Sequence, residues 1–97
     1  ISKKYNVKVD KIILFGSRAR GDYREDSDWD ILLVTEEKVK YDIIVEMTDE
    51  LVEKGIDPQI INVTKEHYER YKDIVGDISH TATREGKILW NAESITT

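Results

Sequence analysis

The sequence predicts a single small domain of the α/β (α+β) class over residues 1–97. Short apolar runs of strand length alternate along the chain with longer stretches of helical periodicity, a pattern typical of mixed folds. A chain of 97 residues is too short for two independent cores. Hydrophobic residues make up 39% of it and charged residues 36%, so there is enough apolar material for one core.

The first half of the chain predicts two strands around a polar loop. Residues 1–9 are typical of the end of a helix followed by a connector. Because the chain begins with Ile rather than Met, we expect that further residues precede it in the native protein. Lys11–Phe15 is a short apolar run that a glycine stops, which favours a buried strand. Gly16–Asp28 lacks apolar periodicity and predicts a loop with room for one helical turn, whereas Trp29–Thr35 has the composition of a central strand.

The second half predicts two helical stretches separated by a strand. Apolar residues in steps of three or four predict a helix over Val39–Lys54. Asp57–Thr64 is typical of a strand, and its proline restricts it to a strand start or an edge. Helical periodicity returns over Glu66–Glu85, where a Gly-Asp pair is expected to divide the stretch in two. Lys87–Trp90 is a last short apolar piece.

The composition excludes several kinds of site and partner. Without cysteine there are no disulfides or thiolate ligands, and His67 and His80 are too few and too far apart for a zinc site, so any metal is held by oxygen. No apolar run approaches the roughly 20 residues that cross a bilayer, and we expect a soluble, cytoplasmic protein without a membrane partner. The net charge of −5 argues against bulk duplex nucleic acid as the partner.

Two carboxylates at the start of the second predicted strand indicate a metal site. Asp28 and Asp30 are two residues apart, so in a strand they point to the same face about 6.6 Å apart. Like charges placed in this way repel each other unless a cation lies between them. Hard oxygen ligands favour Mg²⁺ or Mn²⁺, and Mg²⁺ is commonly held by one or two carboxylates together with substrate phosphates.

The loop before these carboxylates has the residues of a phosphate site. Gly16 directly follows a predicted strand and lets the backbone approach a ligand closely, and Ser17 offers a hydroxyl group. Arg18, Arg20 and Arg24 add positive charge, and Arg20 is the strongest candidate for a phosphate contact. The chemistry indicated is attack on a nucleotide phosphorus assisted by metal ions.

The combination of a Gly-Ser pair, a spacer and Asp-x-Asp on the next strand resembles the signature of the minimal nucleotidyltransferases of the DNA polymerase β superfamily. The matching stretch is GSRARGDYREDSDWDILLV. The resemblance implies a polymerase β-like nucleotidyltransferase fold, with a small mixed β-sheet packed against helices. It also implies a nucleoside triphosphate with Mg²⁺, and transfer of a nucleoside monophosphate to an acceptor with release of pyrophosphate. Gly16 and Ser17 match the phosphate-binding pair, and Asp28 and Asp30 the metal-binding carboxylates.

The family usually has a third carboxylate on the strand after the long helix, where it helps to activate the attacking hydroxyl. In this sequence that position falls at Gln59, which can neither bind a metal as an anion nor act as a base. Asp57 lies two residues earlier and is the candidate to replace the third carboxylate in its catalytic role. A catalytic protein needs Asp57 in this role, whereas Gln59 in this role leaves only nucleotide binding.

Short members of this family are often encoded beside a small helical HEPN toxin, which the transferase inactivates by adding AMP. The resemblance therefore implies an antitoxin that transfers AMP, with ATP as the expected donor, to a HEPN partner. One alternative is a noncatalytic module that binds nucleotide or neutralises its partner by contact. An aminoglycoside-type small-molecule transferase also fits the motif, but this chain has no substrate domain for it. The sequence is compatible with a homo-oligomer and identifies neither the acceptor nor the base.

Overall fold

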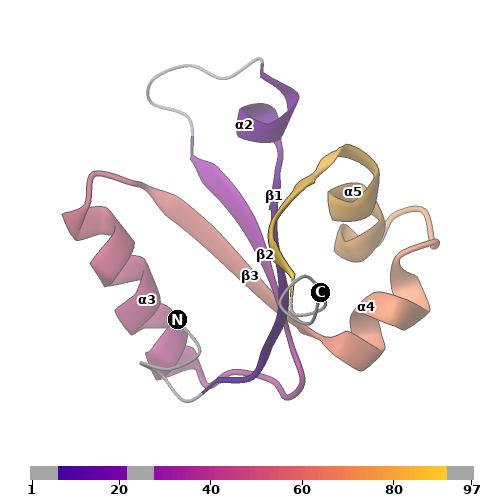
Figure 1. Cartoon of the computed structure of the whole chain (residues 1–97), viewed down its shortest axis with the longest axis horizontal. Helices are drawn as coiled ribbons and strands as arrows, with labels where there is room; N and C mark the ends of the chain where they lie inside the picture. Colours follow the sequence, from indigo (N-terminus) through magenta and orange to yellow (C-terminus); the bar gives the residue numbers. More distant parts are fainter. Residues whose placement is uncertain (1–6, 22–27, 92–97) are drawn as a thin grey trace.

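The structure, a computed structural model, describes residues 7–21 and 28–91. Four strands form one sheet in the order β3-β2-β1-β4 (Figure 1). The β2 and β3 strands are parallel, whereas β1 is antiparallel to both β2 and β4, so the expected mixed sheet is confirmed. The strand bounds are β1 (Val9–Phe15), β2 (Trp29–Thr35), β3 (Pro58–Thr64) and β4 (Lys87–Asn91).

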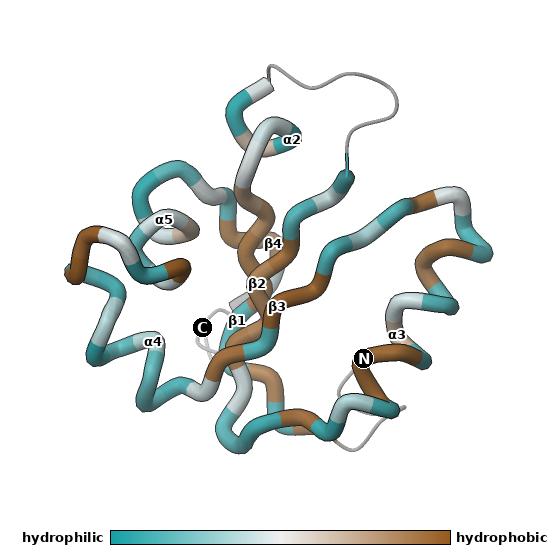
Figure 2. The backbone as a smooth tube through the Cα atoms, turned by 180° about the vertical axis from the view of Figure 1, so that it is seen from behind, coloured by the Kyte–Doolittle hydropathy of each residue, from teal (hydrophilic) through white to brown (hydrophobic). Residues whose placement is uncertain are grey.

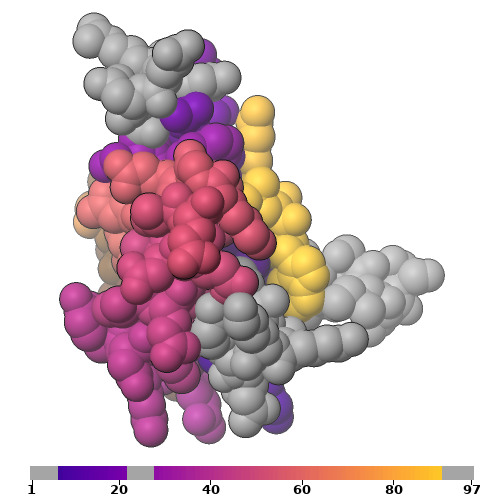
Figure 3. Space-filling view, turned by 90° about the vertical axis from the view of Figure 1, so that its left-hand side faces the viewer, coloured from indigo at the N-terminus to yellow at the C-terminus, as the bar shows by residue number. Residues whose placement is uncertain are grey.

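The helices cover both faces of this sheet. In Figure 1, α3 lies on one side of the strands, and α4 and α5 lie on the other. Figure 3, turned to the α3 side, has β4 running along the edge of that face. Among the described residues no helix is long and apolar enough to cross a membrane. The helix bounds are α2 (Ser17–Arg20), α3 (Tyr41–Glu53), α4 (Lys65–Tyr71) and α5 (Ile78–Glu85).

Most predicted elements are found within two residues of their expected bounds. The first strand begins at Val9, two residues earlier than expected, so the expected connector ends before Val9. The end of a helix expected ahead of that connector falls on residues 1–6, outside the described part. The helical stretch expected up to Glu85 is divided over residues 72–77, around the Gly-Asp pair where the sequence predicts a division. The break has a physical cause: Gly76 has φ 100°, and the Asp77 carboxylate accepts a hydrogen bond from the backbone N–H of Ser79 at the start of α5.

Two apolar clusters, one on each face, hold the layers together. Strands alternate their side chains, so Leu32 and Val34 of β2 pack toward α4 and α5, whereas Leu33 packs toward α3 with Met47. The hydrophobic segments in Figure 2 accordingly run along the central strands and the inner side of α3. The same alternation assigns Asp30, two residues before Leu32, to the α4 and α5 face.

Candidate functional site

The predicted site residues meet at one end of the strands, at the top of Figure 1. The β1 strand ends there at Phe15 and leads into α2, while β2 and β3 begin at the same end. The last turn of α5 also reaches this end, because Glu85 contacts the backbone of Gly16. Residues 22–27, which include Arg24, lie outside the described part. Four elements therefore contribute side chains to one place.

Gly16 is in contact with the carboxylate of Asp30. A Cβ atom at position 16 would lie 2.1 Å from Asp30 Oδ2. The backbone has φ 75° and ψ −159° at this residue, a conformation that is essentially restricted to glycine. Its carbonyl accepts hydrogen bonds from the N–H groups of Ala19 and Arg20, at 3.1 and 3.0 Å, which start the short α2 helix. Glycine is thus required here by both the turn and the carboxylate.

Asp28 directly precedes β2, and Asp30 lies within it. Asp28 is exposed and Asp30 is half-buried. Burial raises the pKa of the Asp30 carboxyl above its usual value, and the nearby charge of Asp28 and, more weakly, that of Glu85 raise it further, while Arg20 lowers it. A paired and partly desolvated carboxylate of this kind becomes more stable when a cation binds.

The carboxylates of Asp28 and Asp30 suit a divalent cation that has coordination positions left for water and substrate. Within residues 7–21 and 28–91 no group of three or more Asp, Glu or His side chains is placed to bind a metal. Among these residues, Asp28 and Asp30 therefore have no third side-chain ligand of this kind. Mg²⁺ in particular is held by one or two carboxylates plus water and substrate phosphates, so the residues present suit such an ion.

The register of β3 fixes the neighbours of these carboxylates. Gln59 pairs directly with Asp30 across the parallel strands. Asp57 lies just before β3, and its carbonyl accepts a hydrogen bond of 3.0 Å from the N–H of Trp29. Residues paired in a parallel ladder point to the same face, so Gln59 lies beside Asp30. Asp28 and Asp57 each stand one residue before this ladder, whose first pair is Trp29 with Pro58. The two candidates for the third position therefore lie at different depths along the strand direction.

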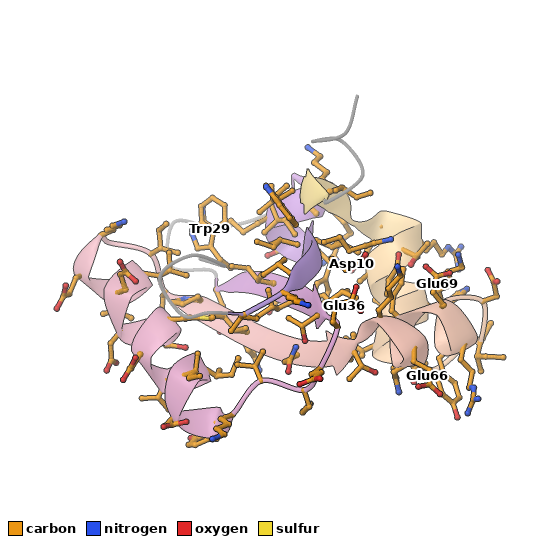
Figure 4. All side chains as sticks on the ribbon, turned by 60° about the horizontal axis from the view of Figure 1, so that its bottom comes forward. Asp10, Trp29, Glu36, Glu66 and Glu69 are labelled. Carbon is orange, nitrogen blue, oxygen red and sulfur yellow. The ribbon has the colours of Figure 1, made fainter. Side chains whose placement is uncertain are left out.

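The arginines of the loop point to different places. Arg20 Nη1 donates to both carboxylate oxygens of Glu85, at 3.2 and 3.1 Å. The guanidinium of Arg18 instead lies over the ring of Trp29, 4.6 Å from its centroid. Trp29, labelled in Figure 4, alternates with its two aspartate neighbours and lies on the α3 side of the sheet, where it lines a pocket together with Met47 and Leu51 of α3. Of the two loop arginines within the described residues, Arg18 and Arg20, Arg20 is thus the one that the structure brings to the carboxylates.

Glu85 is the site residue that the sequence did not predict. It is 65 or more positions away from its partners in the loop, and it ends a helix whose composition is ordinary. His67 is elsewhere: it pairs with Asp77 at 3.3 Å between α4 and α5. Ser17 is half-buried at the first position of α2, directly after the glycine of the turn.

Comparison with known proteins agrees with this geometry. Residues 1–94 match the family described as "Polymerase beta, Nucleotidyltransferase". The "Putative protein adenylyltransferase MJ0604" of Methanocaldococcus jannaschii is 38% identical over 92 residues, which are 93% of this chain and 87% of that protein.

Two solved complexes are similar in fold. One is a toxin–antitoxin with AMP-PNP, matched with a TM-score of 0.72 and 21% identity over 97% of this chain and 70% of the other. The second is a complex of tri-AMPylated Shewanella oneidensis HEPN toxin with MNT antitoxin, with a TM-score of 0.60 and 18% identity, covering 92% of this chain and 62% of the other. At these identities the likeness concerns the fold alone.

Proposed function

Because the chain belongs to the polymerase β nucleotidyltransferase family, we propose that it transfers AMP from ATP to a HEPN-type toxin and acts as its antitoxin. The observation that carries the proposal is the Asp28 and Asp30 pair, packed at Asp30 against the Gly16 turn. The name of the Methanocaldococcus relative supports adenylyl transfer to protein. The AMPylated toxin in the Shewanella complex supports the acceptor. We place the reaction in the cytoplasm, where ATP is available.

The phosphate groups of ATP would be held by the loop. Ser17 supplies a hydroxyl and Arg20 a guanidinium, whose fork of donors matches phosphate oxygens. The glycine at position 16 lets a phosphate come close to the backbone, as it already does for the Asp30 carboxylate. Asp28 and Asp30 would hold Mg²⁺, or Mn²⁺, which when bound neutralises phosphate charge and stabilises the oxygens that attack and leave.

The transfer itself requires one bond to form and one to break. An acceptor hydroxyl oxygen attacks the α-phosphorus of ATP, the bond from that phosphorus to the bridging oxygen breaks, and pyrophosphate leaves. The hydroxyl proton needs an acceptor on the protein or in water. We assign this role to the Asp57 carboxylate, since Gln59 cannot ionise and Asp57 is exposed one residue before the ladder, as Asp28 is.

Calorimetric titration tests the nucleotide site. We expect ATP to bind the wild type in the presence of Mg²⁺, and the Asp28→Asn/Asp30→Asn double variant to lose that metal-dependent binding. GTP and CTP serve as controls for the base. Binding of equal strength in the wild type and the double variant would remove Asp28 and Asp30 from the site and contradict the proposal.

A second candidate function is a noncatalytic antitoxin that neutralises its partner by contact. The observation that favours it is Gln59, a residue without charge in the ladder position next to Asp30. The two functions differ in one experiment with the toxin. An enzyme loses both AMP transfer and neutralisation when Asp28 and Asp30 become asparagine, whereas a contact antitoxin keeps neutralisation.

A further inference from the structure

The Glu85 carboxylate joins the two parts of the loop that we assign to the nucleotide. Its Oε1 atom accepts a hydrogen bond of 3.1 Å from the backbone N–H of Gly16. Both of its oxygens accept from Arg20 Nη1, at 3.2 and 3.1 Å. Hydrogen bonds between ionised partners are roughly twice as strong as neutral ones. One carboxylate therefore fixes the glycine of the turn and the arginine of the helix that follows it.

The backbone that carries Glu85 is itself firmly seated. The next residue, Gly86, packs so closely that an added Cβ would lie 2.2 Å from the Ala82 carbonyl oxygen and 2.4 Å from Ile13 Cγ2. Ala82, one turn earlier in α5, is fully buried. Because Ile13 belongs to β1, the end of α5 is held against the same strand that leads into the loop. The Glu85 side chain thus extends from the closely packed end of α5 to the Gly16 turn.

We propose that Glu85 is a positioning residue of the nucleotide site, which holds the Arg20 guanidinium and the Gly16 turn in the arrangement that receives the phosphates. This inference rests on the proposed function. Its basis is preorganisation: an arginine loses considerable side-chain freedom when it is ordered, and an ion pair formed before the ligand arrives removes that loss from the binding step.

The negative charge of Glu85 acts in the opposite direction, because it repels a triphosphate. Water reduces this repulsion, since the side chains of the pair are 46% exposed for Arg20 and 25% for Glu85. The orientation that the hydrogen bonds from Arg20 and Gly16 to Glu85 impose is not screened in this way. We therefore expect positioning to dominate, so that loss of Glu85 weakens nucleotide binding. If charge repulsion dominated, loss of Glu85 would make nucleotide binding tighter.

The test is a double-mutant cycle on the affinity for ATP with Mg²⁺, measured by calorimetry. Glu85→Gln keeps an oxygen that can accept from Gly16 but removes the charge paired with Arg20, and we expect it to weaken ATP roughly three- to tenfold. Combining it with Arg20→Ala is expected to cause no further loss beyond Arg20→Ala alone, because the effect passes through the arginine. Melting temperatures identify any variant that has lost its fold.

Glu66→Gln is the matched control. Glu66 is in an exposed ion pair with Arg70 at 3.8 Å on α4, on the far side of the molecule from Trp29 in Figure 4. Unchanged ATP affinity in this variant is expected, and weakening equal to that of Glu85→Gln would overturn the proposal. Unchanged or tighter binding in a folded Glu85→Gln variant, or losses that add fully in the double variant, would also overturn it. A wild type that binds no ATP overturns the proposed function and this inference together.

Discussion

Replacement of Gly16 by alanine separates the role of the glycine in the backbone from its role in the site. At φ 75° and ψ −159° an alanine is strained by about 1–3 kcal/mol. The added Cβ would also start 2.1 Å from Asp30 Oδ2, whereas ordinary contact begins at 3.4 Å. The carboxylate must therefore retreat by about 1.3 Å, the difference between these two values.

A displacement of this size is large for a site that binds through geometry. A misplacement of about 1 Å in a catalytic constellation can cost on the order of 100-fold in rate. We therefore expect Gly16→Ala to lower the free energy of unfolding by about 1–3 kcal/mol. We expect the same variant to reduce metal-dependent ATP binding or AMP transfer by about 100-fold.

Urea denaturation and ATP calorimetry on the same protein samples measure the two effects. Gly55→Ala is the matched control, because Gly55 has φ 84° and an added Cβ there meets no atom of the described residues within 4 Å. This control is expected to lose about 1–2 kcal/mol of stability and to keep its ATP affinity. If the two variants were equally active, the contact between Gly16 and Asp30 would have no functional role, and the reasoning would be refuted.

Three further predictions concern carboxylates. Asp57→Asn should lower the rate of AMP transfer with little change in ATP affinity; an unchanged rate would exclude Asp57 as the proton acceptor. Because the pKa of Asp30 is raised, ATP affinity with Mg²⁺ should increase as the pH rises through that pKa, and calorimetry across the pH range should find the rise at lower pH in Asp28→Asn. Asp77→Ala should destabilise the fold by about 1 kcal/mol through loss of the α5 cap. Hydrogen bonds from Ser79 lower the pKa of Asp77, so this difference in urea stability should be present at neutral pH and disappear as the pH falls through that lowered pKa.

The fold was largely predictable because its strands and helices have clear periodicity. The β2 strand has the predicted bounds, and the division between α4 and α5 occurs at the expected Gly-Asp pair. The start of β1 was missed because of Asp10, a buried charged residue that interrupts the apolar pattern. In the fold Asp10 is paired with Lys11 at 3.7 Å and Lys65 at 3.8 Å. The pair with Lys65 is a tertiary contact and cannot be read from local hydropathy.

Part of the candidate site depends on residues that are close in sequence and is predictable. The other part depends on contacts between residues that are far apart in sequence. Residues 16, 17, 28 and 30 are close in sequence, and the period of the strand is enough to place the two aspartates on one face. Glu85 reaches its partners across 69 and 65 residues, and no local pattern in α5 marks it. The pairing of Asp30 with Gln59 likewise depends on the register of two strands that a helix separates. Register of this kind is set by packing over the whole sheet.

The register also bears on how the acceptor reaches the site. If a carboxylate stood at position 59, it would lie beside Asp30, next to the Gly16 turn. Asp57 lies about 6.6 Å further out along the strand direction, and both Asp57 and Asp28 are exposed. A hydroxyl that transfers its proton to Asp57 must therefore approach from the exposed end of the strands, where β2 and β3 begin. That approach suits a hydroxyl presented on the surface of a partner protein better than a small molecule enclosed in a pocket.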